Sequence, residues 1–182
     1  MKKIMFSDKF CLTQAVLSGI KTMTRRVLRD NVPLGNWEET AKCLPYKVGE
    51  VVAIAQNYKE VYPNADFEMV DGNFMTESAG WTNKMFVRAD LMPRHIEFTD
   101  VKAERLQDIS DEDCLREGIR YYHSSDKRWS NNSGYGYHIP KNGLHLFDTP
   151  YEAFANLFER ISGKGTWESN PWVAAYEFKL ID

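Results

Sequence analysis

The sequence predicts an α+β fold in which several short strands form a mixed β-barrel, accompanied by about three helices. Apolar runs suited to strands are short and scattered along the chain, and three segments carry helix start and stop signals. Strands and helices do not alternate in the βαβ rhythm of a parallel sheet. We therefore expect a single domain over residues 1–182, with two loop insertions at about 30–47 and 120–148.

The chain is expected to begin with a short strand at residues 3–6. Asp8 can then cap a helix that runs to about Ser18, with Gly19 as its stop. Residues 21–28 alternate polar and apolar side chains and carry two threonines, which is typical of a strand.

Three further strands are predicted in the middle of the chain. Residues 51–58 are β-branched and apolar, and residues 84–87 and 95–106 also have strand character. In the last of these, the apolar phase shifts between Phe98 and Val101, which predicts a bulge or bend.

Two helices and a closing strand follow. Ser110 can cap a helix with an acidic first turn, and Gly118 ends it. Thr149 followed by Pro150 is a strong signal for the start of the next helix. In residues 171–180, Trp172, Ala174, Tyr176 and Phe178 fall on one face and alternate with the residues between them, so this segment is expected to form the last strand.

Composition places the chain among ordinary globular proteins, with 43% hydrophobic and 27% charged residues. The apolar runs are too short to cross a bilayer, and the start lacks the features of a signal peptide. The three cysteines, Cys11, Cys43 and Cys114, are too sparse for a disulfide framework. We expect a cytoplasmic protein with no membrane partner.

Charge is unevenly distributed along the chain. The net charge of −3 argues against coating of duplex DNA by charge alone. Residues 1–29 nevertheless hold seven basic side chains and one acidic one, a local charge of +6, whereas residues 108–117 hold five acidic and one basic, a local charge of −4. The basic segment either offers a patch to phosphate or is neutralised by the acidic segment in the fold, and the sequence leaves both interpretations open.

Four segments, at residues 17–26, 46–52, 101–119 and 170–178, together cover somewhat under half of the chain. In this order they resemble the ASCH family, especially its longer branch from phages, prophages and gut bacteria. The resemblance implies a PUA-like β-barrel, and the family has been proposed to bind RNA. Some small bacterial members are amidohydrolases that remove the acetyl group from N4-acetylcytidine.

The resemblance also implies which residues act. Matched by position, the catalytic Lys, Thr and Glu of those enzymes are Lys21, Thr24 and Glu117. Threonine would be the nucleophile, a lysine of lowered pKa its base, and Glu117 a donor to the leaving nitrogen or its orienting group, without a metal or cofactor. Backbone amides near Gly19 would hold the oxyanion. One departure from this branch is that Ala55, Gln56, Asn57 and Tyr58 replace an Arg-Glu-Thr-Trp-like stretch, so two charges are missing.

Binding without turnover is the leading prediction from the sequence, with RNA or a modified nucleoside as the ligand in a basic cleft. Its candidate contacts are Gly19, Lys21, Arg25, Arg26 and Arg105. Hydrolysis of an acylated nucleobase is the alternative prediction, so enzymatic activity is left open.

A third prediction is a phage or mobile-element accessory module that binds another protein. Its candidate surface is the second insertion, whose aromatic residues could also stack on bases or form a lid: Tyr121, Tyr122, Trp129, Tyr135, Tyr137 and Phe147. The spacing of His123, His138 and His145 argues against a zinc site there.

Overall fold

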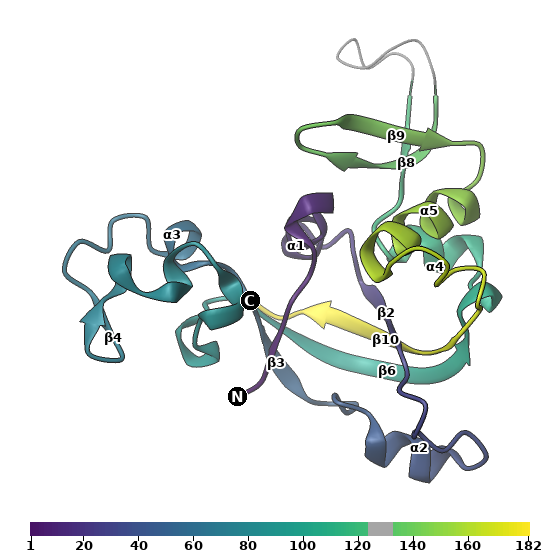
Figure 1. The fold of residues 1–182 in the computed structure, drawn as a ribbon, viewed down its shortest axis with the longest axis horizontal. Helices are drawn as coiled ribbons and strands as arrows, with labels where there is room; N and C mark the ends of the chain where they lie inside the picture. The colour runs from purple at the N-terminus through teal and green to yellow at the C-terminus, as the bar shows by residue number, and fades with distance from the viewer. Residues whose placement is uncertain (124–132) are drawn as a thin grey trace.

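The computed structural model describes residues 1–123 and 133–182 and has the α+β architecture predicted from the sequence (Figure 1). Within these residues, the strands are β1 (Lys3–Ile4), β2 (Met23–Val27), β3 (Val51–Ile54), β4 (Met69–Val70), β5 (Asn73–Phe74), β6 (His95–Arg105), β7 (Arg120–Tyr122), β8 (Gly134–Ile139), β9 (Gly143–Phe147) and β10 (Trp172–Leu180). The α-helices are α1 (Leu12–Leu17), α2 (Trp37–Cys43), α3 (Tyr58–Val61), α4 (Asp111–Arg116) and α5 (Pro150–Ser162).

The main sheet contains five strands in the order β1-β3-β6-β10-β2. β1 pairs with β3 in parallel and the other pairs are antiparallel, so the predicted mixed sheet is confirmed. Among the described residues the sheet does not close into a barrel, because β1 and β2 remain its two edges. A side chain reaches from one edge toward the other: Arg26 Nη2 of β2 donates at 2.7 Å to the carbonyl oxygen of Met5, the residue that follows β1.

A bulge bends β6 where the sequence predicts it. Glu177 of β10 faces Asp100, but the next residue, Phe178, faces Phe98, so Thr99 is the extra residue. The bend directs Phe98 and Phe178 into the main core, where both are nearly inaccessible to solvent.

The helix ends of the C-terminal half agree with their sequence signals. The Ser110 side chain accepts from the amide of Asp113 at the start of α4, and Thr149 accepts from the amide of Glu152 at the start of α5. The predicted N-terminal helix is instead split in two. A 3-10 turn at Asp8–Phe10 precedes α1, and Cys11 between them has a φ of 55°.

Residues 56–94 form a lobe with its own apolar cluster, which lies beside the main sheet at the left of Figure 1. The chain leaves the sheet after β3 and returns at β6, where the Ile54 amide donates to the carbonyl of Arg94 at 2.9 Å. The strand predicted at residues 84–87 is wrong: Lys84–Phe86 is a 3-10 helix. Asn83 caps it by accepting from the Met85 amide, which stabilises a turn in place of a strand.

The two predicted insertions contain regular structure. α2 lies in the first, and β7, β8 and β9 form an antiparallel sheet in the second, where they pack over α5. Gly136 permits the close β8–β9 pairing, since a Cβ there would lie 1.8 Å from the carbonyl oxygen of His145. Tyr137 and Phe147 are stacked, whereas Trp129 lies outside the described residues. A protein-binding role for this insertion stays a prediction.

None of the helices in residues 1–123 and 133–182 is both long and apolar enough to span a bilayer.

Candidate active site

The three predicted catalytic residues line one cavity of about 420 Å³. Gly19, with a φ of 72°, turns the chain after α1, so that Lys21 precedes β2 and Thr24 lies within it. Glu117 is the residue that follows α4. The fold therefore brings the early basic segment and the distant carboxylate together, as the sequence predicts.

Lys21 and Glu117 form a buried ion pair at the base of this cavity. Lys21 Nζ donates to Glu117 Oε2 at 2.5 Å and to the Glu117 carbonyl oxygen at 2.8 Å. The side chains are 2% and 5% exposed, so water screens the pair very little. Burial lowers the pKa of Lys21, and the charge of Glu117 opposes this effect.

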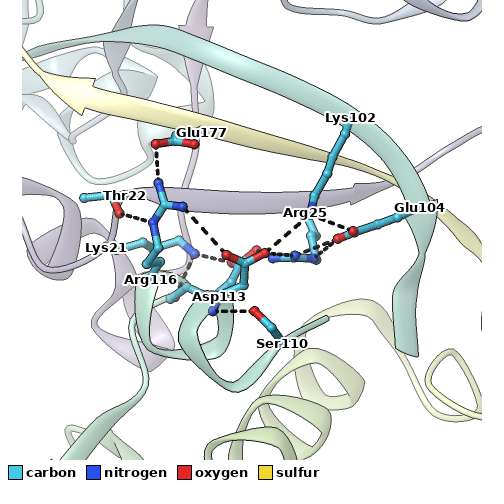
Figure 2. A network of polar contacts seen from close by, with 10 residues as sticks. Lys21, Thr22, Arg25, Lys102, Glu104, Ser110, Asp113, Arg116 and Glu177 are labelled. Atoms are coloured by element: carbon cyan, nitrogen blue, oxygen red, sulfur yellow. Dashed lines mark hydrogen bonds and ion pairs between the residues drawn. The ribbon is translucent and has the colours of Figure 1, made fainter. Parts of the chain in front are cut away.

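The Arg25 side chain points to the opposite face of β2 from Thr24 and is enclosed by three carboxylates, two of which, Glu104 and Asp113, are labelled in Figure 2. Its Nε and Nη2 donate to Glu104 Oε1 at 2.9 and 2.6 Å, Nη2 also donates to Asp113 Oδ2 at 2.8 Å, and Nη1 donates to Glu117 Oε1 at 3.2 Å. The Arg25 side chain is fully buried. Every nitrogen of the guanidinium is engaged, so the predicted contact between Arg25 and a ligand phosphate is not supported.

The basic and acidic segments of the sequence thus neutralise one another in part, through Lys21 and Arg25 on one side and Asp113 and Glu117 on the other. Besides Arg25, two cations contact Asp113: Lys102 at 3.6 Å and Arg116 at 3.7 Å. Arg116 also pairs with Glu177, and its Nε donates to the Thr22 hydroxyl at 3.4 Å. The neutralising interpretation therefore holds for Lys21 and Arg25, whereas Arg26 lines the cavity.

Thr24 presents a free hydroxyl to the cavity. Its side chain lies on the cavity wall, and the residue is 5% exposed. Across the described residues, no group of the protein forms a hydrogen bond with this hydroxyl, so it is available to a ligand.

Apolar side chains form the walls that sequence reasoning missed. One wall is the stripe of α5, namely Phe154, Leu157, Phe158 and Ile161, and the other includes Met5 and Phe6. The Lys21 Nζ and the Arg26 guanidinium each lie 6.0 Å from the centre of the Phe6 ring. The α5 stripe was recognisable in the sequence as an apolar helix face, but nothing there showed that part of it borders a cavity.

Two other predicted contacts lie outside the cavity lining. The amides of Gly19, Ile20 and Lys21 donate to carbonyl groups of α1 at 2.9 Å, which removes them as oxyanion donors. Arg105 lies over the Trp172 ring at 4.9 Å and donates to the Asn170 carbonyl at 3.1 Å. Arg26, in contrast, does line the cavity.

The histidines of the second insertion occupy separate contacts. His123 packs on Tyr121, His145 stacks on Tyr137, and His138 lies 3.8 Å from Cys11 Sγ. In the part of the chain that is described, no group of three or more His, Cys, Asp or Glu residues has the geometry of a metal site.

Of the comparisons with known proteins, the one with solved structures gave matches and the other two gave none. No protein-family profile matches the chain, and no curated protein matches it. Protein EF3133 from Enterococcus faecalis V583, described under the family model DUF984, is 16% identical with a TM-score of 0.47, over 100% of this chain and 80% of that chain. An ASCH domain from Lactobacillus crispatus JV V101 is 14% identical with a TM-score of 0.42, over 98% of this chain and 78% of that one.

Proposed function

We propose that the cavity beside β2 binds an acylated nucleoside and that the protein hydrolyses its exocyclic amide, with N4-acetylcytidine as the representative substrate. One observation carries this proposal: a buried lysine of lowered pKa, held by Glu117, lines the same cavity as an unpaired threonine hydroxyl. Covalent amide hydrolysis requires a base and a nucleophile in one site, and this cavity holds a candidate for each. A volume near 420 Å³ suits a small ligand and not a folded RNA.

The reaction has two halves. The neutral amine of Lys21 takes the proton of the Thr24 hydroxyl as its oxygen attacks the amide carbon, and the resulting ammonium gives that proton to the departing nitrogen. This step releases the amino nucleoside and leaves an acyl ester on Thr24. Water, deprotonated by Lys21, then attacks the ester, which releases the carboxylic acid and restores the hydroxyl.

Glu117 acts in this scheme as a positioning residue. Both of its carboxylate oxygens accept from cations, Oε2 from Lys21 and Oε1 from Arg25. A carboxylate held in this way is an acceptor, so we assign it to orienting Lys21 and balancing its charge. Of the two roles that the sequence left open, donation to the leaving nitrogen and orientation of it, we assign neither.

Binding of a nucleoside without turnover is the second candidate. It is favoured by the direction of the Lys21 ammonium, which donates to Glu117 and makes no hydrogen bond to Thr24. In this case the cavity would recognise a modified nucleoside, free or within RNA, and the ion pair would only shape its floor.

Incubation with N4-acetylcytidine, followed by chromatography of cytidine, separates the two candidates. Hydrolysis by the wild type that disappears in Thr24→Val supports the first. Thr22→Val is the matched control, because Thr22 precedes the same strand but lies outside the cavity lining. Binding without product supports the second candidate, and absence of both binding and product contradicts the proposal.

A further inference from the structure

The cavity borders a free edge of the main sheet. β2 is the last strand of the order β1-β3-β6-β10-β2, so β10 pairs with it on one side only. The other side of β2 has backbone groups that no neighbouring strand engages, which is unusual for a strand whose residues Met23, Thr24 and Arg25 are all buried.

The register identifies the residues whose backbone groups face that edge. The Leu28 amide donates to the Trp172 carbonyl, and the Phe178 amide donates to the Thr22 carbonyl, both at 2.9 Å. Since hydrogen-bonded and non-hydrogen-bonded pairs alternate along an antiparallel ladder, the even-numbered residues of β2 are bonded to β10. The N–H and C=O groups of Arg25 and Val27 therefore point away from β10.

These backbone groups have no protein partner among the described residues. The bonds outside the sheet ladders include neither the N–H nor the C=O of Arg25 or Val27. Arg25 is only 4% exposed, so water from outside does not readily replace a partner there. An unused donor and acceptor at such a position indicate a place for a ligand.

The cavity runs along this edge of β2. Its lining includes four consecutive strand residues, from Thr24 to Val27. Because side chains of a strand alternate between two faces, a cavity on one face would touch every second residue. Contact with all four places the cavity beside the backbone itself.

We propose that the free N–H and C=O groups of Arg25 and Val27 recognise the hydrogen-bonding edge of a planar nucleobase. In an extended residue the backbone N–H and C=O groups point to the same side, so they present a hydrogen-bond donor next to an acceptor. Cytosine presents the complementary pair, a ring-nitrogen acceptor next to an exocyclic N–H donor. The apolar walls from α5 and Phe6 suit the faces of such a ring. A cavity of about 420 Å³ suits a single base and its sugar and not a peptide strand. This inference rests on the proposed nucleoside site.

Replacement of Val27 by proline tests the inference, because it removes an N–H that the ladder does not use. Edge strands tolerate proline at such positions, and the preceding residue is already extended. Val27→Ala is the matched control, since it shortens the side chain but keeps the N–H. We expect Val27→Pro to bind cytidine about 3- to 10-fold more weakly than Val27→Ala in calorimetry.

A ligand change supplies the second arm of the test. 3-Deazacytidine lacks the ring nitrogen that would accept from Val27, so the wild type should bind it about 3- to 10-fold more weakly than cytidine, and Val27→Pro should not distinguish the two. Equal binding of cytidine and 3-deazacytidine by the wild type overturns the inference even if Val27→Pro does not fold. Equal cytidine affinity of Val27→Pro and Val27→Ala also overturns it and leaves the edge to a strand-like partner. If the wild type binds no nucleoside, it is the proposed function that fails.

Discussion

The two faces of β2 differ in how their polar groups are satisfied. On one face, Arg25 donates to three carboxylates with every nitrogen of its guanidinium. On the cavity side, the Thr24 hydroxyl forms no hydrogen bond within the described chain, and the buried Nε of Arg26 has no partner there. Neighbouring residues of one five-residue strand thus lie in opposite electrostatic environments.

This contrast separates a structural cluster from a candidate ligand site. A buried cation surrounded by carboxylates holds elements together, and its own bonds leave little for a ligand. A polar group that is left unpaired in a cavity is available to a ligand. The basic segment therefore divides into Arg25, which fixes α4 against the sheet, and Thr24 and Arg26, which face the cavity.

The largest effect is expected from Arg25→Met. This change leaves the buried carboxylate of Glu117 and the partly buried carboxylates of Glu104 and Asp113 without their shared partner, so the free energy of unfolding should fall by about 3–5 kcal/mol. Urea denaturation followed by circular dichroism measures the loss. Arg29→Ala, at an exposed position, is the control and should change stability by less than about 0.5 kcal/mol. A loss below about 1 kcal/mol for Arg25→Met would show that the cluster contributes little.

Thr24→Val should affect turnover and spare the fold. The hydroxyl makes no hydrogen bond within the described chain, so its loss should change stability by less than about 1 kcal/mol. As the proposed nucleophile, however, its removal should lower kcat on N4-acetylcytidine on the order of 10³-fold. Unchanged kcat in a correctly folded Thr24→Val protein would exclude the covalent route.

The pH dependence of hydrolysis should report on Lys21. The free amine is the active form, so kcat/KM should rise with pH, and the rise should finish below the range of an ordinary lysine because burial lowers the Lys21 pKa. The charge of Glu117 raises that pKa, so Glu117→Gln should move the profile to lower pH. The exposed Glu112→Gln is the control and should leave the profile in place. A Glu117→Gln profile displaced to higher pH would contradict this role.

The smallest effect is expected from Tyr176→Phe. Burial raises the pKa of Tyr176 to about 12, against an opposing contribution from the Tyr46 backbone, and within the described chain no hydrogen bond of good geometry reaches its buried hydroxyl. Removing it should leave stability unchanged or raise it by up to about 1 kcal/mol. Tyr137→Phe is the contrasting variant, because that hydroxyl donates to Asn156 at 2.5 Å and accepts from Arg160 at 3.2 Å. Tyr137→Phe should lower the free energy of unfolding by about 1–2 kcal/mol, as measured by thermal or urea denaturation. A clear loss in Tyr176→Phe would indicate an ordered water on that hydroxyl.

Local signals in the sequence predicted much of the fold. The caps at Ser110 and Thr149 and the bulge near Phe98 depend on a few neighbouring residues, and each is confirmed. The strand predicted from residues 51–58 ends at Ile54, since Asn57 caps α3 through the Glu60 amide. The lobe of residues 56–94 was not predicted, because its apolar residues form a separate cluster only once the chain has folded back.

The sequence predicted which residues lie together in the candidate site, but not how their charged groups pair. The family resemblance indicated Lys21, Thr24 and Glu117, which line one cavity. The pairing of Arg25 with Glu104 and Asp113 depends on contacts across 79 and 88 positions of the chain, so no spacing rule in the sequence shows it. The same limit explains why Arg105, at the far end of β6, was wrongly grouped with the cavity residues.

The hydrogen bond between Ile54 and Arg94 has a consequence for how this chain can vary. The segment of about forty residues between β3 and β6 begins and ends at adjacent points of the sheet, so its length does not set the register of these two strands. The entropy cost of closing a loop rises only slowly with its length. Shortened versions of residues 56–94 should therefore be compatible with the same sheet and cavity. The exception is Lys84, whose ammonium reaches back to Asp8 at 2.6 Å and to the Phe6 carbonyl, next to the cavity wall. Through this lysine the lobe contacts the backbone next to the cavity, so a graft that omits it would remove one of the two side-chain donors to the Phe6 carbonyl and leave the Thr13 hydroxyl as the other.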